Sequence, residues 1–104
     1  MKIVKVIYTT TTEFTAQNQV NIKTVMADLR NLNAPGINYN SCLQADGKTF
    51  IHTAFFSNDD DQKILNELPS FKAFQTALKG SGLESPPKQE ILTLVDSTTN
   101  IFNQ

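Results

Sequence analysis

The sequence predicts an α+β fold whose elements follow in the order strand, helix, strand, strand, helix, strand. Three observations support this class. They are two stretches of helical periodicity, four short runs rich in β-branched and aromatic residues, and an Asp-Gly pair between the two middle runs. The chain has 104 residues, a length typical of one domain, so we expect residues 1–104 to form a single domain.

The first strand is expected over residues 2–9, where β-branched residues dominate. One face of this strand is apolar and carries Val4, Val6 and Tyr8. The other face mixes apolar Ile3 and Ile7 with polar Lys5 and Thr9. This pattern predicts that both faces are covered. The four threonines at 9–12 are expected to end the strand and cap the next helix. That helix is expected over 15–32, with apolar side chains at helical spacing on one stripe.

The second and third strands are expected to form a hairpin. Residues 33–36, Asn-Ala-Pro-Gly, end the helix, and residues 37–44 then alternate between apolar and polar side chains, which favours an edge strand. Its polar face carries Cys42, for which we expect a small filler role. Asp46-Gly47 predicts a type I′ turn, so residues 48–57 should pair antiparallel with 37–44. On this third strand one face carries Phe50, His52, Ala54 and Phe56.

The second helix is expected to begin at residues 57–61, Ser-Asn-Asp-Asp-Asp. Ser57 or Asn58 can accept its free backbone N–H groups, and the aspartates complement the positive end of the helix dipole. Pro69 has no N–H to donate, so the helix should break there and restart with Pro69 in a first turn. Gly80 or Gly82 is expected to end it in a left-handed conformation.

The last strand is expected over residues 89–95, with the chain held extended before it by Pro86 and Pro87. This order of elements is the split βαβ plan of ferredoxin-like domains. Right-handed crossovers place both helices on one face of a four-stranded antiparallel sheet. The other face, which is also apolar, is left open, and this predicts a homodimer packed sheet against sheet.

The stretch from Leu68 to Leu78, LPSFKAFQTAL, resembles the antibiotic-biosynthesis-monooxygenase-like family of dimeric α/β barrels. That family often shows a Pro-His-Phe-like motif followed by an aromatic residue here. Pro69, Phe71 and Phe74 match the motif, and Ser70 stands where a histidine is common. The resemblance extends to the order of elements over most of the chain. It implies a ferredoxin-like dimeric α/β barrel.

The family includes cofactor-free oxygenases of polycyclic aromatic substrates, haem-degrading enzymes and many proteins of unknown activity. In the oxygenase branch an Asn and a Trp four residues apart face the pocket, and here His52 and Phe56 stand in similar places. The haem-degrading branch uses Asn, Trp and a helical His. This chain has no Trp, its only His is on a strand, and Asn66 lies near the helical position. The resemblance therefore implies the fold more than either chemistry.

A pocket between the sheet and the helices is the expected functional site. The candidate catalytic residue is His52, and the candidate pocket residues are Lys5, Thr9, Phe50, Phe56 and Phe71. Histidine titrates near neutral pH, so His52 could take a proton from a phenol-like substrate. The competing interpretation is a core histidine that is hydrogen-bonded to a neighbour.

Three functions stay open. The first is a dimer that binds a small aromatic or apolar molecule. The second is a cofactor-independent monooxygenase or isomerase that acts on an aromatic hydroxy compound. The third is a structural or regulatory dimer without a ligand. Fold alone does not choose among them, because function depends on the site.

Composition excludes several other classes. The 9 Lys and Arg against 10 Asp and Glu give a net charge of −1, which argues against nucleic-acid binding. No apolar run approaches the roughly 18 residues of a membrane span. One His and one Cys predict neither a metal nor a haem nor another cofactor. The lone Cys42 and the lack of a signal-peptide pattern lead us to expect a cytoplasmic protein.

Overall fold

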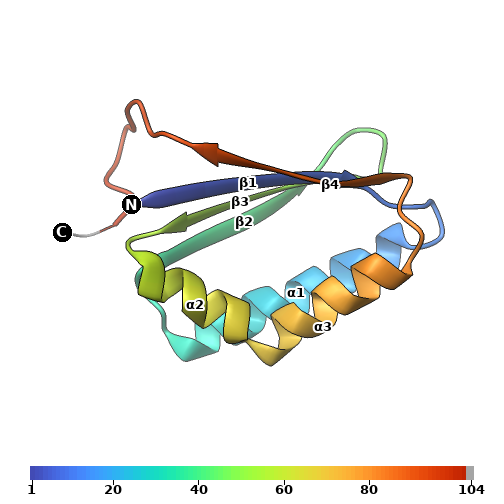
Figure 1. Ribbon diagram of the computed structural model, residues 1–104, viewed down its shortest axis with the longest axis horizontal. Helices are drawn as coiled ribbons and strands as arrows, with labels where there is room; N and C mark the ends of the chain where they lie inside the picture. The colour runs from blue at the N-terminus through green and yellow to red at the C-terminus, as the bar shows by residue number, and fades with distance from the viewer. Residues whose placement is uncertain (103–104) are drawn as a thin grey trace.

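The computed structural model describes residues 1–102 and shows a four-stranded antiparallel sheet with all helices on one face (Figure 1). The elements in chain order are β1 (Lys2–Thr9), α1 (Thr15–Leu32), β2 (Ile37–Leu43), β3 (Thr49–Phe56), α2 (Asp59–Glu67), α3 (Pro69–Gly80) and β4 (Ser85–Leu92). The strand order across the sheet is β2-β3-β1-β4. The predicted ferredoxin-like βαββαβ fold is therefore confirmed.

The register of the strands decides which side chains share a face. In β1, Val6 lies opposite His52 of β3 and Gln89 of β4, while Ser41 of β2 lies opposite His52 from the other side. Because side chains alternate along a strand, these residues all point toward the helices. Cys42 points the other way on an edge strand, as predicted, but it is exposed and therefore does not have the filler role that we expected.

The core lies between the inner face of the sheet and the helices. Its buried apolar residues are Val4, Tyr8, Ile22, Val25, Leu29, Phe50, Ala54, Phe56, Leu65, Leu68, Phe74 and Leu78. The alternation predicted for β3 is confirmed, since Phe50 and Phe56 are each only 2% exposed. The helical stripe of α1 supplies the opposite wall of this core.

Pro69 divides the second helical region into α2 and α3, as predicted. Leu68 ends α2 and precedes α3 in an extended conformation, with φ −65° and ψ 122°. This conformation is the one favoured before a proline, and Pro69 occupies the first turn of α3. At the start of α2, the side chain of Asn58 accepts a hydrogen bond from the backbone N–H of Asp61 at 3.1 Å. Both predicted boundary signals are confirmed.

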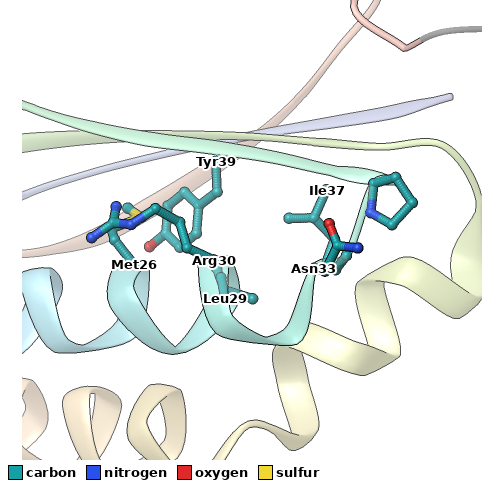
Figure 2. A pocket seen from close by; sticks show the side chains of 8 residues that line it. Met26, Leu29, Arg30, Asn33, Ile37 and Tyr39 are labelled. Atoms are coloured by element: carbon teal, nitrogen blue, oxygen red, sulfur yellow. The ribbon is translucent and has the colours of Figure 1, made fainter.

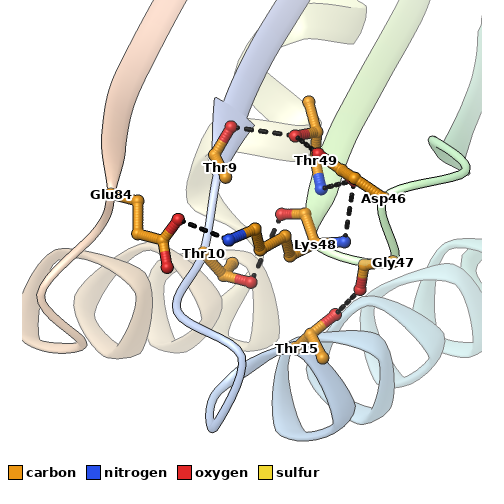
Figure 3. Close-up of polar contacts among 8 residues, drawn as sticks. All are labelled: Thr9, Thr10, Thr15, Asp46, Gly47, Lys48, Thr49 and Glu84. Atoms are coloured by element: carbon orange, nitrogen blue, oxygen red, sulfur yellow. Dashed lines mark hydrogen bonds and ion pairs between the residues drawn. The ribbon is translucent and has the colours of Figure 1, made fainter.

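The turn between β2 and β3 is not the predicted type I′ turn. That turn requires positive φ at both central residues, whereas Gly47 has φ 77° and Asp46 does not have positive φ. Instead the carboxylate of Asp46 accepts hydrogen bonds from the backbone N–H groups of Lys48 at 3.0 Å and Thr49 at 2.9 Å (Figure 3). The side chain of Asp46 thus closes a longer loop.

The threonine run does not cap α1, contrary to expectation. The N-cap of α1 is Phe14, without a side-chain hydrogen bond. The Thr10 hydroxyl donates to the Lys48 carbonyl at 3.3 Å, and the Thr15 hydroxyl donates to the Gly47 carbonyl at 2.7 Å (Figure 3). The backbone N–H of Thr10 also donates to the Lys48 carbonyl, at 2.9 Å. These contacts fasten the β1–α1 connection to the hairpin. Partners 32 or more residues away replaced the local cap that the sequence pattern favoured.

The last strand begins earlier than predicted and ends at Leu92 instead of residue 95. It includes Pro86 and Pro87, which an edge strand tolerates because one side of its backbone needs no hydrogen-bond partner. Gly82, with φ 75°, is the predicted left-handed residue after α3. Beyond β4 the side chain of Val95 is 99% exposed.

Candidate functional site

A cavity of about 250 Å³ lies between the inner face of the sheet and α3. The side chains that line it are Val6, Tyr8, Tyr39, His52, Phe71, Phe74, Gln75, Leu78, Lys79, Leu83, Pro87 and Gln89. Lys79 is the one charged member of this lining, and no acidic side chain belongs to it. The cavity is therefore mainly apolar and aromatic, with polar groups at a few points.

His52 lies at the centre of an aromatic cluster. Its ring centroid is 5.3 Å from that of Tyr8, 5.7 Å from that of Tyr39 and 5.6 Å from that of Phe74. Phe71 stacks on Phe74 at 5.8 Å and meets Tyr39 edge-on at 6.4 Å. Offset and edge-to-face contacts at these distances are favourable for aromatic rings. Strands β1, β2 and β3 and helix α3 all contribute to the cluster.

A chain of hydrogen bonds runs through this cluster. The amide nitrogen Nδ2 of Asn18 donates to the Tyr8 hydroxyl at 2.9 Å. The Tyr8 hydroxyl oxygen is 2.7 Å from His52 Nε2, and the Tyr39 hydroxyl oxygen is 2.6 Å from His52 Nδ1. Asn18 is fully buried, and Tyr8 and His52 are 2% and 5% exposed. Both ring nitrogens of His52 thus meet a tyrosine hydroxyl, and the Ser41 hydroxyl adds a longer contact of 3.5 Å to Nε2.

Burial keeps the chain of hydrogen bonds uncharged at neutral pH. Desolvation lowers the pKa of His52 to about 4, in the predicted direction. Desolvation also raises the pKa of Tyr8 to about 12, against a smaller lowering by the hydrogen bond from Asn18. The pKa of Tyr39 is raised above its ordinary value by burial and then by the proximity of Tyr8. At pH 7 the imidazole is neutral and both phenols keep their protons.

Of the sequence-predicted residues on the inner face, His52 and Phe71 line the cavity. Phe50 and Phe56 also point toward the helices, but both are buried in the core and neither lines this cavity. Phe50 instead lines a neighbouring hollow of about 380 Å³. The structure therefore does not place these two among the walls of the cavity around His52, because the core closes over them. The catalytic role of His52 stays a prediction.

Lys5 and Thr9 lie on the other face of the sheet. Lys5 is opposite Thr53 in the β1–β3 register, one residue out of phase with His52. The Thr9 hydroxyl is 2.9 Å from the Thr49 hydroxyl (Figure 3). Strand alternation therefore separates both residues from the cavity of their own chain, and their prediction as its lining residues is wrong.

Three residues of the hydrogen-bonded chain escaped the sequence prediction. Tyr8 and Tyr39 occupy inner-face positions of β1 and β2, the two strands that flank β3, so the predicted hairpin pairing already placed Tyr39 near His52. Asn18 lies four residues before Ile22 on the apolar stripe of α1. A polar residue on such a stripe is a signal that it meets a buried partner.

A second hollow lies between α1 and β2 (Figure 2). It measures about 320 Å³, and an adjoining hollow of about 380 Å³ shares Met26, Arg30 and Tyr39 with it. Figure 2 shows the Tyr39 ring reaching from β2 toward α1 beside Met26 and Arg30. Because Tyr39 also lines the inner cavity, its ring forms the wall between the two spaces.

Residues 1–102 hold neither a cluster of metal ligands nor a helix suited to a membrane. Within this range no group of three or more His, Cys, Asp or Glu side chains is arranged to hold a metal ion. None of the helices in the same range combines the length and apolar composition needed to cross a bilayer. The polar groups that line the cavity itself are those of its tyrosines, histidine, glutamines and lysine.

No protein-family model and no curated protein sequence matches this chain. Among solved structures, an antibiotic biosynthesis monooxygenase superimposes with a TM-score of 0.78 over 92% of this chain and 100% of its own, at 10% identity. Rv0793 from Mycobacterium tuberculosis gives a TM-score of 0.77 over 94% and 98% of the two chains, at 12% identity. SnoaB, a cofactor-independent oxygenase from Streptomyces nogalater, gives 0.68 over 95% and 98%, at 16% identity.

The structural neighbours of this chain thus include several antibiotic biosynthesis monooxygenase structures at high structural similarity and low identity. The resemblance predicted from the sequence is confirmed for the fold, an α+β ferredoxin-like fold that matches those structures. Identities of 10 to 16% for the three structures compared above establish the fold alone, and function has to be argued from the site.

Proposed function

We propose that this protein binds a small aromatic or apolar molecule in the cavity between the sheet and α3. The observation that carries this proposal is the aromatic cluster of Tyr39, Phe71 and Phe74 around the neutral His52, beside open space. Apolar cavities with a few convergent polar groups are the usual form of small-molecule sites.

The size of the cavity limits the ligand. At about 250 Å³ it lies just below the roughly 300–1,000 Å³ of pockets for drug-sized compounds. A compound with one or two rings therefore fits this space better than a large polycyclic one. The exposed rim residues Gln75 and Lys79 of α3 lie where such a compound would enter.

The binding proposal is tested by closing the cavity at its rim. Calorimetric titration of the protein with one- and two-ring aromatic compounds is expected to find saturable binding. Gln75→Trp should weaken it at least tenfold, because the indole would cover the opening. Thr76→Trp is the matched control, since Thr76 is also exposed on α3 but does not line the cavity. Equal effects of the two variants, or no binding by any compound, would contradict the proposal.

A cofactor-independent oxygenase or isomerase acting on an aromatic hydroxy compound is the second candidate function. It is favoured by the common fold with SnoaB, which is described as a cofactor-independent oxygenase, and by the proximity of His52 to the cavity. The low pKa of His52 argues against it. Moving a proton from a phenol of pKa about 10 to an imidazole of pKa about 4 costs about 8 kcal/mol. We therefore place binding ahead of catalysis.

Oxygen uptake measurements separate the two candidates. If the protein is an oxygenase, a bound aromatic hydroxy compound should be consumed together with oxygen, and His52→Ala should abolish the uptake while retaining binding. Binding without oxygen uptake supports the first candidate. A protein that neither binds nor reacts would be the structural or regulatory dimer that the sequence left open.

We further propose that the protein is a homodimer formed through the outer face of the sheet. Half-buried Ile7, Ile51 and Phe55 lie on this face, which no helix covers (Figure 1). Open apolar surface of this kind is typical of interfaces. Light scattering should give about twice the chain mass of 11.6 kDa, and Ile51→Lys should reduce it to one chain. Thr24→Lys, on the exposed side of α1, should leave the dimer intact.

A further inference from the structure

The hydrogen-bonded chain through His52 has a direction. A neutral imidazole carries a proton on one nitrogen and a lone pair on the other, so one ring nitrogen donates and the other accepts. The Tyr8 and Tyr39 hydroxyls, at 2.7 Å and 2.6 Å from Nε2 and Nδ1, must therefore play opposite roles. Which tyrosine donates to His52 decides what the cavity offers to a ligand.

Asn18 sets this direction. Its amide nitrogen donates to the Tyr8 oxygen at 2.9 Å, and its oxygen Oδ1 is buried without a hydrogen-bond partner within residues 1–102. If the amide were turned around, the group left unpaired would be an NH₂ with two donors instead of one oxygen. Unpaired buried donors are the rarer and costlier case. The Tyr8 oxygen therefore accepts a hydrogen bond from Asn18. Because Tyr8 is buried, its own hydroxyl proton also needs a partner, and it donates a hydrogen bond to His52 Nε2.

The other end of the chain follows from this assignment. With Nε2 as the acceptor, Nδ1 carries the imidazole proton and donates a hydrogen bond to the Tyr39 oxygen at 2.6 Å. The hydroxyl of Tyr39 has no other hydrogen-bond partner within the described residues. Its own proton is therefore the one donor of the chain that remains uncommitted. Tyr39 lines the inner cavity and also the two hollows between α1 and β2, and a ligand in the inner cavity is the partner that we consider for this donor.

The rim of the cavity also offers hydrogen-bond donors and no charged acceptor. Lys79 carries an ammonium group, which has donors only, and among the described residues it makes no ion pair. No carboxylate lines the cavity to accept a proton from a ligand. The charged group at the rim and the free hydroxyl beside the aromatic cluster both favour an oxygen that accepts hydrogen bonds.

We infer that the chain of hydrogen bonds is donated from Asn18 through Tyr8 and His52 to Tyr39. We further infer that the Tyr39 hydroxyl donates a hydrogen bond to an aromatic ligand that carries a carbonyl oxygen. The identity of the ligand rests on the proposed binding function. The direction of the chain is a property of the protein alone. The two parts are therefore tested by separate measurements.

Nitrogen-15 NMR of the ligand-free protein tests the direction. His52 is the only histidine, so its two ring nitrogens give a single pair of signals. At pH 7 we expect Nδ1 to be protonated and Nε2 to be unprotonated. Asn18→Leu removes the donor that orders the chain, and should yield a mixture of both tautomers. A proton on Nε2 in the unmodified protein, or an unchanged tautomer in folded Asn18→Leu, would overturn the assignment.

Two compounds of nearly equal shape test the ligand. Acetophenone has a carbonyl oxygen where α-methylstyrene has a CH₂ group. We expect acetophenone to bind about fivefold more tightly, the effect of one hydrogen bond, and Tyr39→Phe to reduce this ratio to about one. Equal affinities in the unmodified protein would overturn the donor role of Tyr39. Binding of neither compound would overturn the ligand assignment and count against the proposed function, while the NMR result on direction would stand.

Discussion

Both faces of the sheet carry apolar side chains, but helices cover only one of them. On the inner face Phe50 and Phe56 are 2% exposed beneath the helices. On the outer face Ile51 and Phe55 of the same strand remain half-buried, with no helix above them. Alternation along β3 supplies both sets. The difference shows that the cover, and not the composition, makes one face a core and leaves the other available to a partner.

The polar side chains of the two faces also differ in their access to solvent. Inside, Asn18, Tyr8 and His52 are buried and joined by hydrogen bonds of 2.7 and 2.9 Å. Outside, Lys5 and Thr53 sit among apolar neighbours and keep contact with solvent. Burial of a polar group is costly unless it is paired. The inner face therefore required a connected network, and the outer face did not.

The largest expected effect comes from removing one ring from each face. Phe50→Ala should lower the free energy of unfolding by about 3–5 kcal/mol, because it leaves a cavity in a closed core. Phe55→Ala should cost about 1 kcal/mol in the isolated chain, because this ring is only half-buried. Urea unfolding at a protein concentration low enough to keep the chain monomeric measures both. Equal losses would mean that the faces do not differ as the structure indicates.

Acid should destabilise the inner face in particular. The pKa of His52 is about 4 in the folded chain, against an ordinary value of 6.5, so below pH 6.5 the unfolded chain binds a proton that the folded chain refuses. Stability is therefore complete above pH 6.5 and falls as the pH decreases toward 4. At pH 5 the loss should be about 2 kcal/mol. Chemical unfolding at pH 7, 6 and 5 measures this dependence.

The matched variant for the acid experiment is His52→Gln. It removes the only histidine, so its unfolding free energy should change little between pH 7 and 6, where carboxylates remain ionised. A slope in the variant equal to that of the unmodified protein would assign the acid sensitivity to other groups. A flat profile in both would show that His52 keeps an ordinary pKa in the folded state.

The smallest expected effect concerns Pro69, which separates α2 from α3 above the inner face of the sheet. Pro69→Ala should cost about 0.4–1 kcal/mol, mainly because the unfolded chain gains freedom. Leu68 should then lose its preference for the extended conformation between α2 and α3. Thermal unfolding measures the cost, and NMR of the backbone reports the conformation. A loss above 3 kcal/mol would mean that the break itself holds the core together.

The sequence determined the features that depend on neighbouring residues. The order of elements, the two faces of β3 and the division at Pro69 were all predicted, because strand alternation, helical spacing and the missing proline N–H act within a few residues. The Asn58 cap and the left-handed Gly82 were each one of two predicted candidates, beside Ser57 and Gly80, for the same reason. These features need no knowledge of what packs on them.

Tertiary structure decided the features that join distant segments. The threonine at position 10 bonds to a hairpin 38 residues away instead of capping its own helix. Phe50 and Phe56 became part of the core and do not line the cavity around His52. His52 acquired partners 13 and 44 residues away in Tyr39 and Tyr8. Propensity acts over a few residues along the chain, whereas a buried polar group takes whichever partner the packed elements bring within about 3 Å.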